Sequence, residues 1–251
     1  MARTANIPVK MGYLSRMQAA AIHLIPVPLS GAGIEQLSHE AIEAAHALDF
    51  FVAERAKSAR SFLRLARHPL PASAVEVVQM PREDLRSFFR NLLPAVLQGR
   101  GLGVLSEAGV PCVADPGAEL VALAHEQNIE VRPYPGPNSL ILALMASGMN
   151  AQSFTFHGYL PSKKDPLRQK LAQLAAEWKK NHIPQAFMET PYRNHQVFDA
   201  IRNHVAGTTA LCVASKLGNP DQLIRRRLVS EWTDEDCTKH FDMPSIFILG
   251  Q

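Results

Sequence analysis

The sequence predicts an α/β protein with two domains, the first built on a mostly parallel sheet and the second on a mixed sheet. Short runs of β-type residues alternate with helical patterns over most of the chain. Toward the C-terminal end, three such runs follow one another without a helical pattern between them, which predicts antiparallel pairing. The length of 251 residues is sufficient for two domains with separate cores.

The first half contains strand and helix patterns in alternation. Residues 21–29 form a long apolar run, residues 38–48 follow with apolar side chains at helical spacing, and residues 50–54 complete a βαβ unit. The pattern continues with strands at 74–80, 101–106 and 130–135 and with helices at 82–98 and 117–128. We expect Pro94 to kink or split the first of these two helices, because proline removes a helical hydrogen bond.

The second half has a different order of elements, which indicates a second domain. Helices are expected over 139–148, 166–181 and 194–205, and strands over 153–160, 185–189, 209–217, 222–232 and 245–250. The helix at 139–148 is apolar all round, which predicts that it is buried. The proline-rich stretch 132–138 separates the two halves. We therefore expect a leader at 1–20, an N-terminal domain at 21–135 and a C-terminal domain at 136–251.

Composition and charge restrict the class of protein. With 47% hydrophobic and 20% charged residues, and no apolar run near the roughly 18 residues that a membrane helix needs, the chain is expected to be soluble, cytoplasmic and not membrane-bound. Cys112, Cys212 and Cys237 lie far apart, so neither a disulfide framework nor a metal site is expected. The net charge of +3 permits an anionic partner such as RNA without requiring one.

The first twenty residues are basic, with Arg3, Lys10 and Arg16 and no acidic residue. This composition superficially suits a transit peptide, but we expect a disordered leader, because unanchored termini are usually loose. Translation from Met17 is a further alternative, since that residue stands just before the first strand pattern.

The stretch "GLGVLSEAGVPCVADPG" (101–117) has the pattern of a buried strand followed by a turn and a helix start. If the strand is parallel, the turn lies at its carboxyl end, where open α/β sheets bind ligands. Gly109 permits close approach of a ligand, and Asp115 with Pro116 predicts a helix N-cap. A dinucleotide fingerprint is excluded because "GAGIEQ" and "GLGVLS" lack the third glycine, and no nucleotide-binding GxxxxGK[ST] loop is present.

Four segments in this order, "VLSEAGVPCVADPG", "YPGPNSLILALMASG", "FTFHGYLPSKK" and "METPYR", resemble the tetrapyrrole-methylase superfamily. The resemblance extends over about residues 22 to 230 and is greatest to the branch of ribosomal RNA ribose 2′-O-methyltransferases. It implies a two-domain α/β homodimer that binds S-adenosylmethionine in a cleft between the domains and transfers its methyl group to RNA without a metal. The turn at 106–109 would then line the cofactor pocket.

The resemblance also implies roles for particular residues. Ser106 to Gly109 match the family's Ser-Asp-Ala-Gly turn, with glutamate in place of aspartate, and residues 136–139 match its Pro-Gly-Pro-Ser segment. The N-terminus of the helix that follows this segment is expected to be able to hold the cofactor's carboxylate. The cofactor-binding residues expected are Pro28, Leu29, Ser106, Glu107, Ala108, Gly109, Gly136, Pro137, Ser139, Met188, Glu189 and Ala214.

Catalytic and substrate-binding residues are less closely defined. Glu54 and Lys216 are candidate proton acceptors, the latter only if burial lowers its pKa, and a surface charge is the alternative for each. "KLGN" (216–219) departs from the family's Glu-Leu-Thr-Lys run, which leaves the acceptor open. A porphyrin-type carbon methyltransferase and a catalytically silent cofactor- or RNA-binding relative are therefore the alternatives.

Three arginines are candidates for contact with the substrate. Arg193 lies in the "METPYR" segment, whereas Arg225 and Arg227 are expected on one face of a strand and Arg226 on the other. Arg225 and Arg227 would either contact RNA phosphates or, as charges on an edge strand, protect the sheet edge from aggregation.

Overall fold

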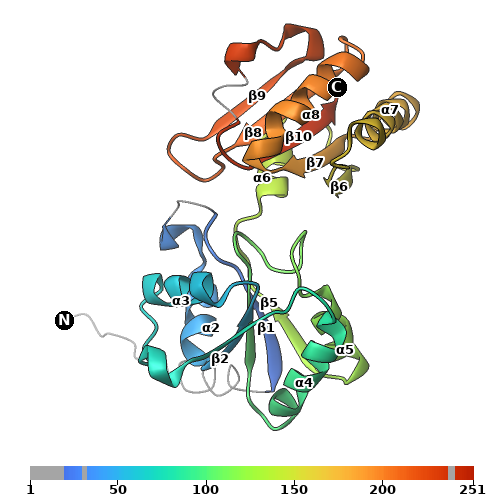
Figure 1. Cartoon of the computed structure of the whole chain (residues 1–251). Coiled ribbons are helices and arrows are strands. Elements are labelled where there is room, and N and C mark those ends of the chain that lie inside the picture. Colours follow the sequence, from blue (N-terminus) through green and yellow to red (C-terminus); the bar gives the residue numbers. More distant parts are fainter. Residues whose placement is uncertain (1–19, 30–32, 237–240) are drawn as a thin grey trace, which may run out of the picture. The chain divides into compact units, whose positions relative to one another are not determined.

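A computed structural model describes residues 20–29, 33–236 and 241–251. The expected leader, apart from its last residue, and Cys237 lie outside these ranges. The chain divides into two compact units, an N-terminal unit that ends at Pro137 and a C-terminal unit that begins at Asn138. The division falls within the proline-rich stretch 132–138, two residues after the expected boundary. Figure 1 shows both units.

The N-terminal unit is built on a five-stranded sheet with the order β3-β2-β4-β1-β5. Its strands are β1 (Ala21–Ile25), β2 (Phe50–Ala53), β3 (Glu76–Gln79), β4 (Leu102–Leu105) and β5 (Glu130–Pro133). The pairs β1–β4, β1–β5, β2–β3 and β2–β4 are all parallel, as the sequence predicted. β1 ends before Pro26, which has no N–H to donate, so it is shorter than the apolar run 21–29.

Helices cover both faces of this sheet (Figure 1). On one face, α2 (His39–Ala47) and α3 (Ala56–Leu65) pack through a core that includes Ala44, Phe62 and Phe51. On the other, α4 (Leu85–Leu97) and α5 (Ala118–Glu126) pack through a core that includes Phe89 and Leu120. Two short 3₁₀ helices, η1 (Ile34–Gln36) and η2 (Ala72–Ala74), lie in the connections.

Three details of the N-terminal unit differ from the prediction. The sequence did not predict the helix α3. α4 continues through Pro94 rather than splitting there, and Pro94 O still accepts from Gln98 N. Asp115 is not a helix cap: α5 begins at Ala118 with Gly117 as its N-cap. The loop remains irregular up to that point because Ala114 and Gly117 have positive φ angles of 59° and 131°.

The C-terminal unit is built on a mixed five-stranded sheet with the order β6-β7-β10-β8-β9. Its strands are β6 (Thr155–Tyr159), β7 (Gln185–Glu189), β8 (Ala210–Ser215), β9 (Leu223–Leu228) and β10 (Ser245–Gly250). β6 pairs with β7 in parallel, whereas β10 is antiparallel to both β7 and β8, and β8 is antiparallel to β9. The predicted antiparallel pairing of the last strands is confirmed.

Helices α6, α7 and α8 and the 3₁₀ helix η3 also belong to the described part of this unit. α7 (Lys164–Asn181) and α8 (Pro191–His204) share a core with one sheet face that includes Leu171, Phe198 and Phe247, and η3 (Val229–Glu231) follows β9. α6 (Ser139–Ala146) contacts β10. The expectation that α6 is buried all round is wrong, because the side chains of Ile141 and Met145 are 43% and 75% exposed.

Candidate functional site at the ends of β1 and β4

β1 and β4 are neighbours in the sheet, but the connections that leave them cover opposite faces. The chain leaves β1 toward α2 on one face and leaves β4 toward α5 on the other. Such a reversal is a topological switch point, and ligands of open α/β sheets bind outside the carboxyl ends of the strands there. The segments that follow β1 and β4, residues 26–29 and 106–109, contain six of the expected cofactor-binding positions.

Backbone contacts hold these two segments together. Val27 and Gly109 form an isolated antiparallel bridge, in which each N–H donates to the other residue's carbonyl oxygen over 3.0 Å. Ser106 Oγ donates to Gly109 O over 2.5 Å, which closes the turn after β4. Leu29 N donates to Gln36 Oε1 over 2.8 Å. The turn is therefore tied to both strands before any ligand binds.

Gly109 is required at its position for two reasons. Its φ of +75° lies in the left-handed region, which residues other than glycine rarely adopt. A Cβ at Gly109 would lie 2.8 Å from Pro137 O and 3.2 Å from Leu29 Cδ2. The turn thus brings together three segments that are far apart in the sequence and that contain the expected residues Leu29, Ser106, Gly109 and Pro137.

The other expected positions in this unit differ in their surroundings. Gly136 packs against Pro26, whose Cβ and Cγ would lie 2.3 and 2.4 Å from a Cβ at Gly136. Pro28 is half-buried and Ala108 is exposed, so both reach solvent beside the turn.

Acidic side chains gather beside this turn. β2 and β4 end at the same level, since Ala53 pairs with Leu105, and Glu54 and Glu107 follow these ends closely. Glu107 Oε2 accepts from Ser58 Oγ over 2.8 Å, and Arg55 Nε lies 4.0 Å away. Burial, with smaller contributions from Glu54 and Glu107, raises the pKa of Asp115 to about 6. These carboxylates favour a ligand that is positively charged or that donates hydrogen bonds.

Glu189 and Arg193 connect two loops of the C-terminal unit. Glu189, fully buried at the end of β7, accepts from Leu160 N over 3.1 Å, and burial raises its pKa. Arg193 donates to the carbonyl oxygens of Leu160 and Pro161 over 2.9 Å and lies 3.3 Å from Glu189 Oε2. Since the Arg193 guanidinium is used in these contacts, its assignment to substrate binding stays a prediction without geometric support.

Met188 and Ala214 lie in one row across the C-terminal sheet. Each pairs with Ile246 of β10, so their side chains share the sheet face opposite the core under α7 and α8. Ser139 is the first residue of α6, and the side chain of Asn138 already accepts from Ile141 N at that terminus over 3.1 Å. The roles of Met188, Glu189, Ala214 and Ser139 in cofactor binding stay predictions.

Lys216 does not meet the condition for accepting a proton. Its Nζ lies 3.0 Å from Asp242 Oδ2 and 3.4 Å from Asp221 Oδ2. The hydrogen bond with Asp242, supported by Asp221, raises its pKa. The sequence-based hypothesis required burial to lower the pKa, and two neighbouring carboxylates have the opposite effect.

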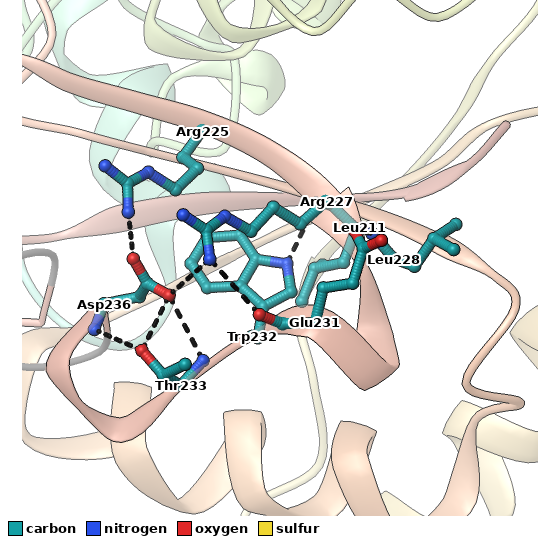
Figure 2. A network of polar contacts seen from close by, with 8 residues as sticks. All are labelled: Leu211, Arg225, Arg227, Leu228, Glu231, Trp232, Thr233 and Asp236. Carbon is teal, nitrogen blue, oxygen red and sulfur yellow. Dashed lines mark hydrogen bonds and ion pairs between the residues drawn. The ribbon is translucent and has the colours of Figure 1, made fainter.

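Arg225 and Arg227 share one face of the edge strand β9, as predicted, and both bind Asp236 (Figure 2). Arg227 also donates to Glu231 O over 3.2 Å. Thr233 adds two hydrogen bonds to Asp236 Oδ2, from its Oγ1 over 2.8 Å and from its N–H over 3.2 Å. The network thus ties the edge strand to the segment that follows η3. The two arginines are 39% and 37% exposed, and contact with RNA stays a prediction that must compete with Asp236.

Comparison with known families matches residues 22–232 to the tetrapyrrole (corrin/porphyrin) methylases. The chain belongs to this family. The match covers the turn at 106–109, the acidic side chains beside it and most of the C-terminal unit.

Curated relatives and solved structures are consistent with this family. Proteins named ribosomal RNA small subunit methyltransferase I from Halalkalibacterium halodurans and Synechocystis are each 29% identical over 76% and 78% of the chain. The matches cover 62% and 66% of these two relatives, so the chain spans less than two thirds of their length. The one from Bacillus subtilis is 25% identical over 90% of the chain and 75% of its own length.

Among solved structures, the methyltransferase CobJ superposes with a TM-score of 0.62 at 15% identity, over 92% of this chain and 94% of that one. A cobalt precorrin-4 methyltransferase, CbiF, gives 0.60 at 17% identity, over 94% and 96%. At these identities the likeness concerns the fold, which is that of the tetrapyrrole methylases.

In residues 20–29, 33–236 and 241–251, no helix is long and apolar enough to cross a membrane. The same ranges contain no group of three or more histidine, cysteine, aspartate or glutamate residues arranged to hold a metal ion.

For Asp115, sequence reasoning favoured a helix cap over contact with a ligand. It assigned the residue to a helix cap, because aspartate before proline is typical of that position. The signal that the site contains more than a cap was the succession of Glu54, Glu107 and Asp115 after neighbouring parallel strands, which becomes visible once the strand order is known.

Proposed function

We propose that the protein transfers a methyl group from S-adenosylmethionine to a ribose 2′-hydroxyl of ribosomal RNA in the small ribosomal subunit. The observation that carries the proposal is the tied turn at the switch point between β1 and β4, in a chain whose family consists of methylases. The names of its curated relatives support the ribosomal acceptor.

The N-terminal unit fits the cofactor chemically. S-adenosylmethionine carries a sulfonium and an ammonium group, and the cluster of Glu54, Glu107 and Asp115 offers carboxylates with one arginine nearby. Glu107 Oε1 is buried without a hydrogen-bond partner within the described residues, so it is available to a donor. When bound, the cofactor supplies an electrophilic methyl group. Ser106 to Gly109 and residues 28 and 29 form the wall against which we propose that it lies.

The proton of the acceptor hydroxyl needs a base, and a carboxylate suits this better than Lys216. A general base works best with a pKa near the operating pH, and the value of about 6 at Asp115 meets this requirement. We therefore propose that Asp115, rather than Glu54 or Lys216, accepts the proton. Methyl transfer itself is an in-line displacement, for which the protein mainly positions the two reactants.

The activity is tested with labelled S-adenosylmethionine and either small ribosomal subunits or tetrapyrrole precursors. Label in the ribosomal RNA, located at a ribose, supports the proposal. Label in a tetrapyrrole would instead identify a carbon methyltransferase. Cofactor binding without transfer to either substrate would identify a silent relative.

The role of Asp115 is tested by the pH dependence of transfer. The rate should rise as pH increases through about 6, where Asp115 loses its proton, and then level off. Asp115→Asn should lower kcat by two to four orders of magnitude, the usual contribution of a general base. Glu54→Gln is the matched control and should retain the pH step, moved to a lower pH because the charge of Glu54 contributes to the raised pKa of Asp115. Binding of S-adenosylhomocysteine to each variant shows whether a loss concerns proton transfer or cofactor binding.

We further propose a cytoplasmic homodimer, on the basis of the family resemblance and of the ribosomal substrate named for the relatives. Light scattering at micromolar concentration, with and without S-adenosylhomocysteine, should give twice the chain mass. A monomer mass under both conditions contradicts the dimer.

A further inference from the structure

The segment 55–67, which contains α3, has five basic residues and no acidic one. Lys57, Arg60 and Arg64 are spaced by three and four residues, so they lie along one helix face, and Arg67 follows just after the helix end. The opposite face carries Ala59, Phe62 and Leu63 into the core. α3 is therefore an amphipathic helix whose outer face is uniformly cationic.

Within the described residues, this positive charge is little neutralised. The ion pair recorded for the segment joins Arg55 to Glu107 over 4.0 Å, and Arg64 donates to the uncharged Ser61 Oγ over 3.2 Å. Lys57, Arg60, Arg64 and Arg67 are exposed. Arg225 and Arg227 of β9 differ in this respect, because a buried carboxylate already binds both of them.

The basic face borders a groove rather than a flat surface. A hollow of about 510 Å³ lies between α3, the start of β3 and the loop that joins them. Lys57, Arg60, Arg64 and Arg67 line it together with apolar side chains that include Leu63, Val75 and Val77. It thus combines a cationic lining with apolar surface.

His68 holds one wall of this groove in place. Its Nδ1 accepts from Leu70 N over 3.2 Å, so the ring proton lies on Nε2, which faces Leu48 O at 2.9 Å and Ala45 O at 3.1 Å. Both ring nitrogens are therefore used inside the protein. The cationic character of the groove comes from four basic side chains, three of which, Lys57, Arg60 and Arg64, are held on α3.

The groove begins next to the proposed active site. α3 starts two residues after Glu54, and Ser58 in its first turn donates to Glu107 over 2.8 Å. From Lys57 to Arg64 the helix rises by about 10 Å, at roughly 1.5 Å per residue. A polyanion that follows this helix therefore extends from the carboxylates beside the turn along the surface of the N-terminal unit.

We propose that the α3 groove binds the phosphate backbone of single-stranded RNA and leads it to the active site. The proposal rests on the proposed function for the identity of the polyanion, and on charge complementarity for its location. Basic side chains in a groove that follows the backbone are the usual means of binding single-stranded nucleic acid. The apolar surface provides contact for sugars and unpaired bases.

The test replaces Arg60 and Arg64 together by glutamine. Arg82→Gln with Arg90→Gln is the matched control, because it removes the same charge from exposed positions of the same unit. Binding of a single-stranded ribosomal RNA fragment is measured between 0.05 and 1 M salt. Loss of two phosphate contacts should reduce the slope of log K against log salt by about 1.4, which corresponds to about 25-fold weaker binding at 0.1 M salt. The control should keep the parental slope.

Further measurements separate failure of the groove from failure of the proposed function. Binding of S-adenosylhomocysteine and the melting temperature of the Arg60/Arg64 variant should equal those of the parent. KM for small ribosomal subunits should rise while kcat at saturation changes little.

If the parent binds RNA but transfers no methyl group to it, the proposed function fails and the groove proposal stands. If parent and variant bind RNA with equal slopes, the groove proposal fails whatever the activity. Binding to phosphatidylserine vesicles is measured as well. If the Arg60/Arg64 variant loses vesicle binding but binds RNA as the parent does, the groove proposal is overturned and the groove is a membrane-surface site.

Discussion

His23, in the middle of β1, is expected to make the stability of the N-terminal unit depend on pH. The residue is fully buried, and its Nδ1 lies 2.8 Å from the Tyr134 hydroxyl. Burial, together with the charge of Arg132, lowers the pKa of His23 from 6.5 to about 4 in the folded protein, although Glu130 opposes the change. Between these two values the unfolded chain binds a proton that the folded chain does not bind.

The sign and size of the effect follow from this difference. Because the unfolded state takes up the proton, the free energy of unfolding falls as pH decreases from above 6.5 toward 4. The difference of about 2.5 pKa units corresponds to about 3 kcal/mol in total, at about 1.36 kcal/mol per unit. About 2 kcal/mol of this should already be lost at pH 5.

The effect is measured with His23→Asn, which keeps a polar atom near Tyr134 but does not titrate. The free energy of unfolding of the N-terminal unit is measured for parent and variant between pH 4 and 7.5. It is obtained at each pH from the urea dependence of hydrogen exchange at the β1 and β4 amides. The variant is expected to be less stable at pH 7.5, and the gap should narrow by about 3 kcal/mol toward pH 4. His39→Asn, at a side chain 85% exposed on α2, is the control. Both tryptophans lie in the C-terminal unit, so their fluorescence reports the unfolding of that unit. This provides a second control, because His23 belongs to the N-terminal unit. Parallel pH profiles for parent and His23→Asn would refute the reasoning.

Three further predictions concern the turn and the C-terminal unit. Gly109→Ala should destabilise the N-terminal unit by about 1–3 kcal/mol and weaken binding of S-adenosylhomocysteine in calorimetry, since it adds a contact with Pro137 O to the strain of a positive φ. Gly99→Ala, where φ is +98° and nothing lies within 4 Å, carries the strain alone and should leave binding unchanged. Arg225→Gln with Arg227→Gln should destabilise the C-terminal unit by about 1–2 kcal/mol in urea unfolding, because the Asp236 carboxylate loses both cations while solvent screens arginines that are 39% and 37% exposed; an unchanged midpoint would show that the network contributes little. Arg193→Lys should lower the melting temperature of the C-terminal unit while KM for ribosomal subunits stays constant, and a raised KM at unchanged stability would restore its predicted role in substrate binding.

Much of the fold could be read from the sequence because it depends on local patterns. The apolar runs and helical spacings predicted the five parallel strands of the N-terminal unit and the antiparallel strands of the C-terminal unit. α3 was missed although its buried residues Ala59, Phe62, Leu63 and Ala66 stand at the i, i+3, i+4, i+7 spacing of an amphipathic helix. The capping signal was absent, because Arg55 at the N-cap makes no side-chain capping hydrogen bond. Asp115 was assigned to a helix cap because aspartate before proline is typical of that position, but the loop continues beyond it to Gly117.

The candidate site was predictable in part. The turn after β4 was found from a glycine and a strand end, and the family resemblance named its neighbours. That Val27 pairs with Gly109, or that Lys216 lies between two carboxylates, was not predictable, since each contact joins segments whose proximity depends on the order of strands in a sheet.

The sequence by itself therefore determined the strands, the helices other than α3, the mostly parallel and mixed sheets, and the motif set of the methylase family. The tertiary structure alone decided which chemical groups meet. It gave Asp115 its raised pKa, turned Arg225 and Arg227 toward Asp236, and placed the first turn of α3 beside Glu107. The physical reason is that secondary structure follows from interactions over a few residues, whereas burial and charge pairing depend on contacts between residues far apart in the chain.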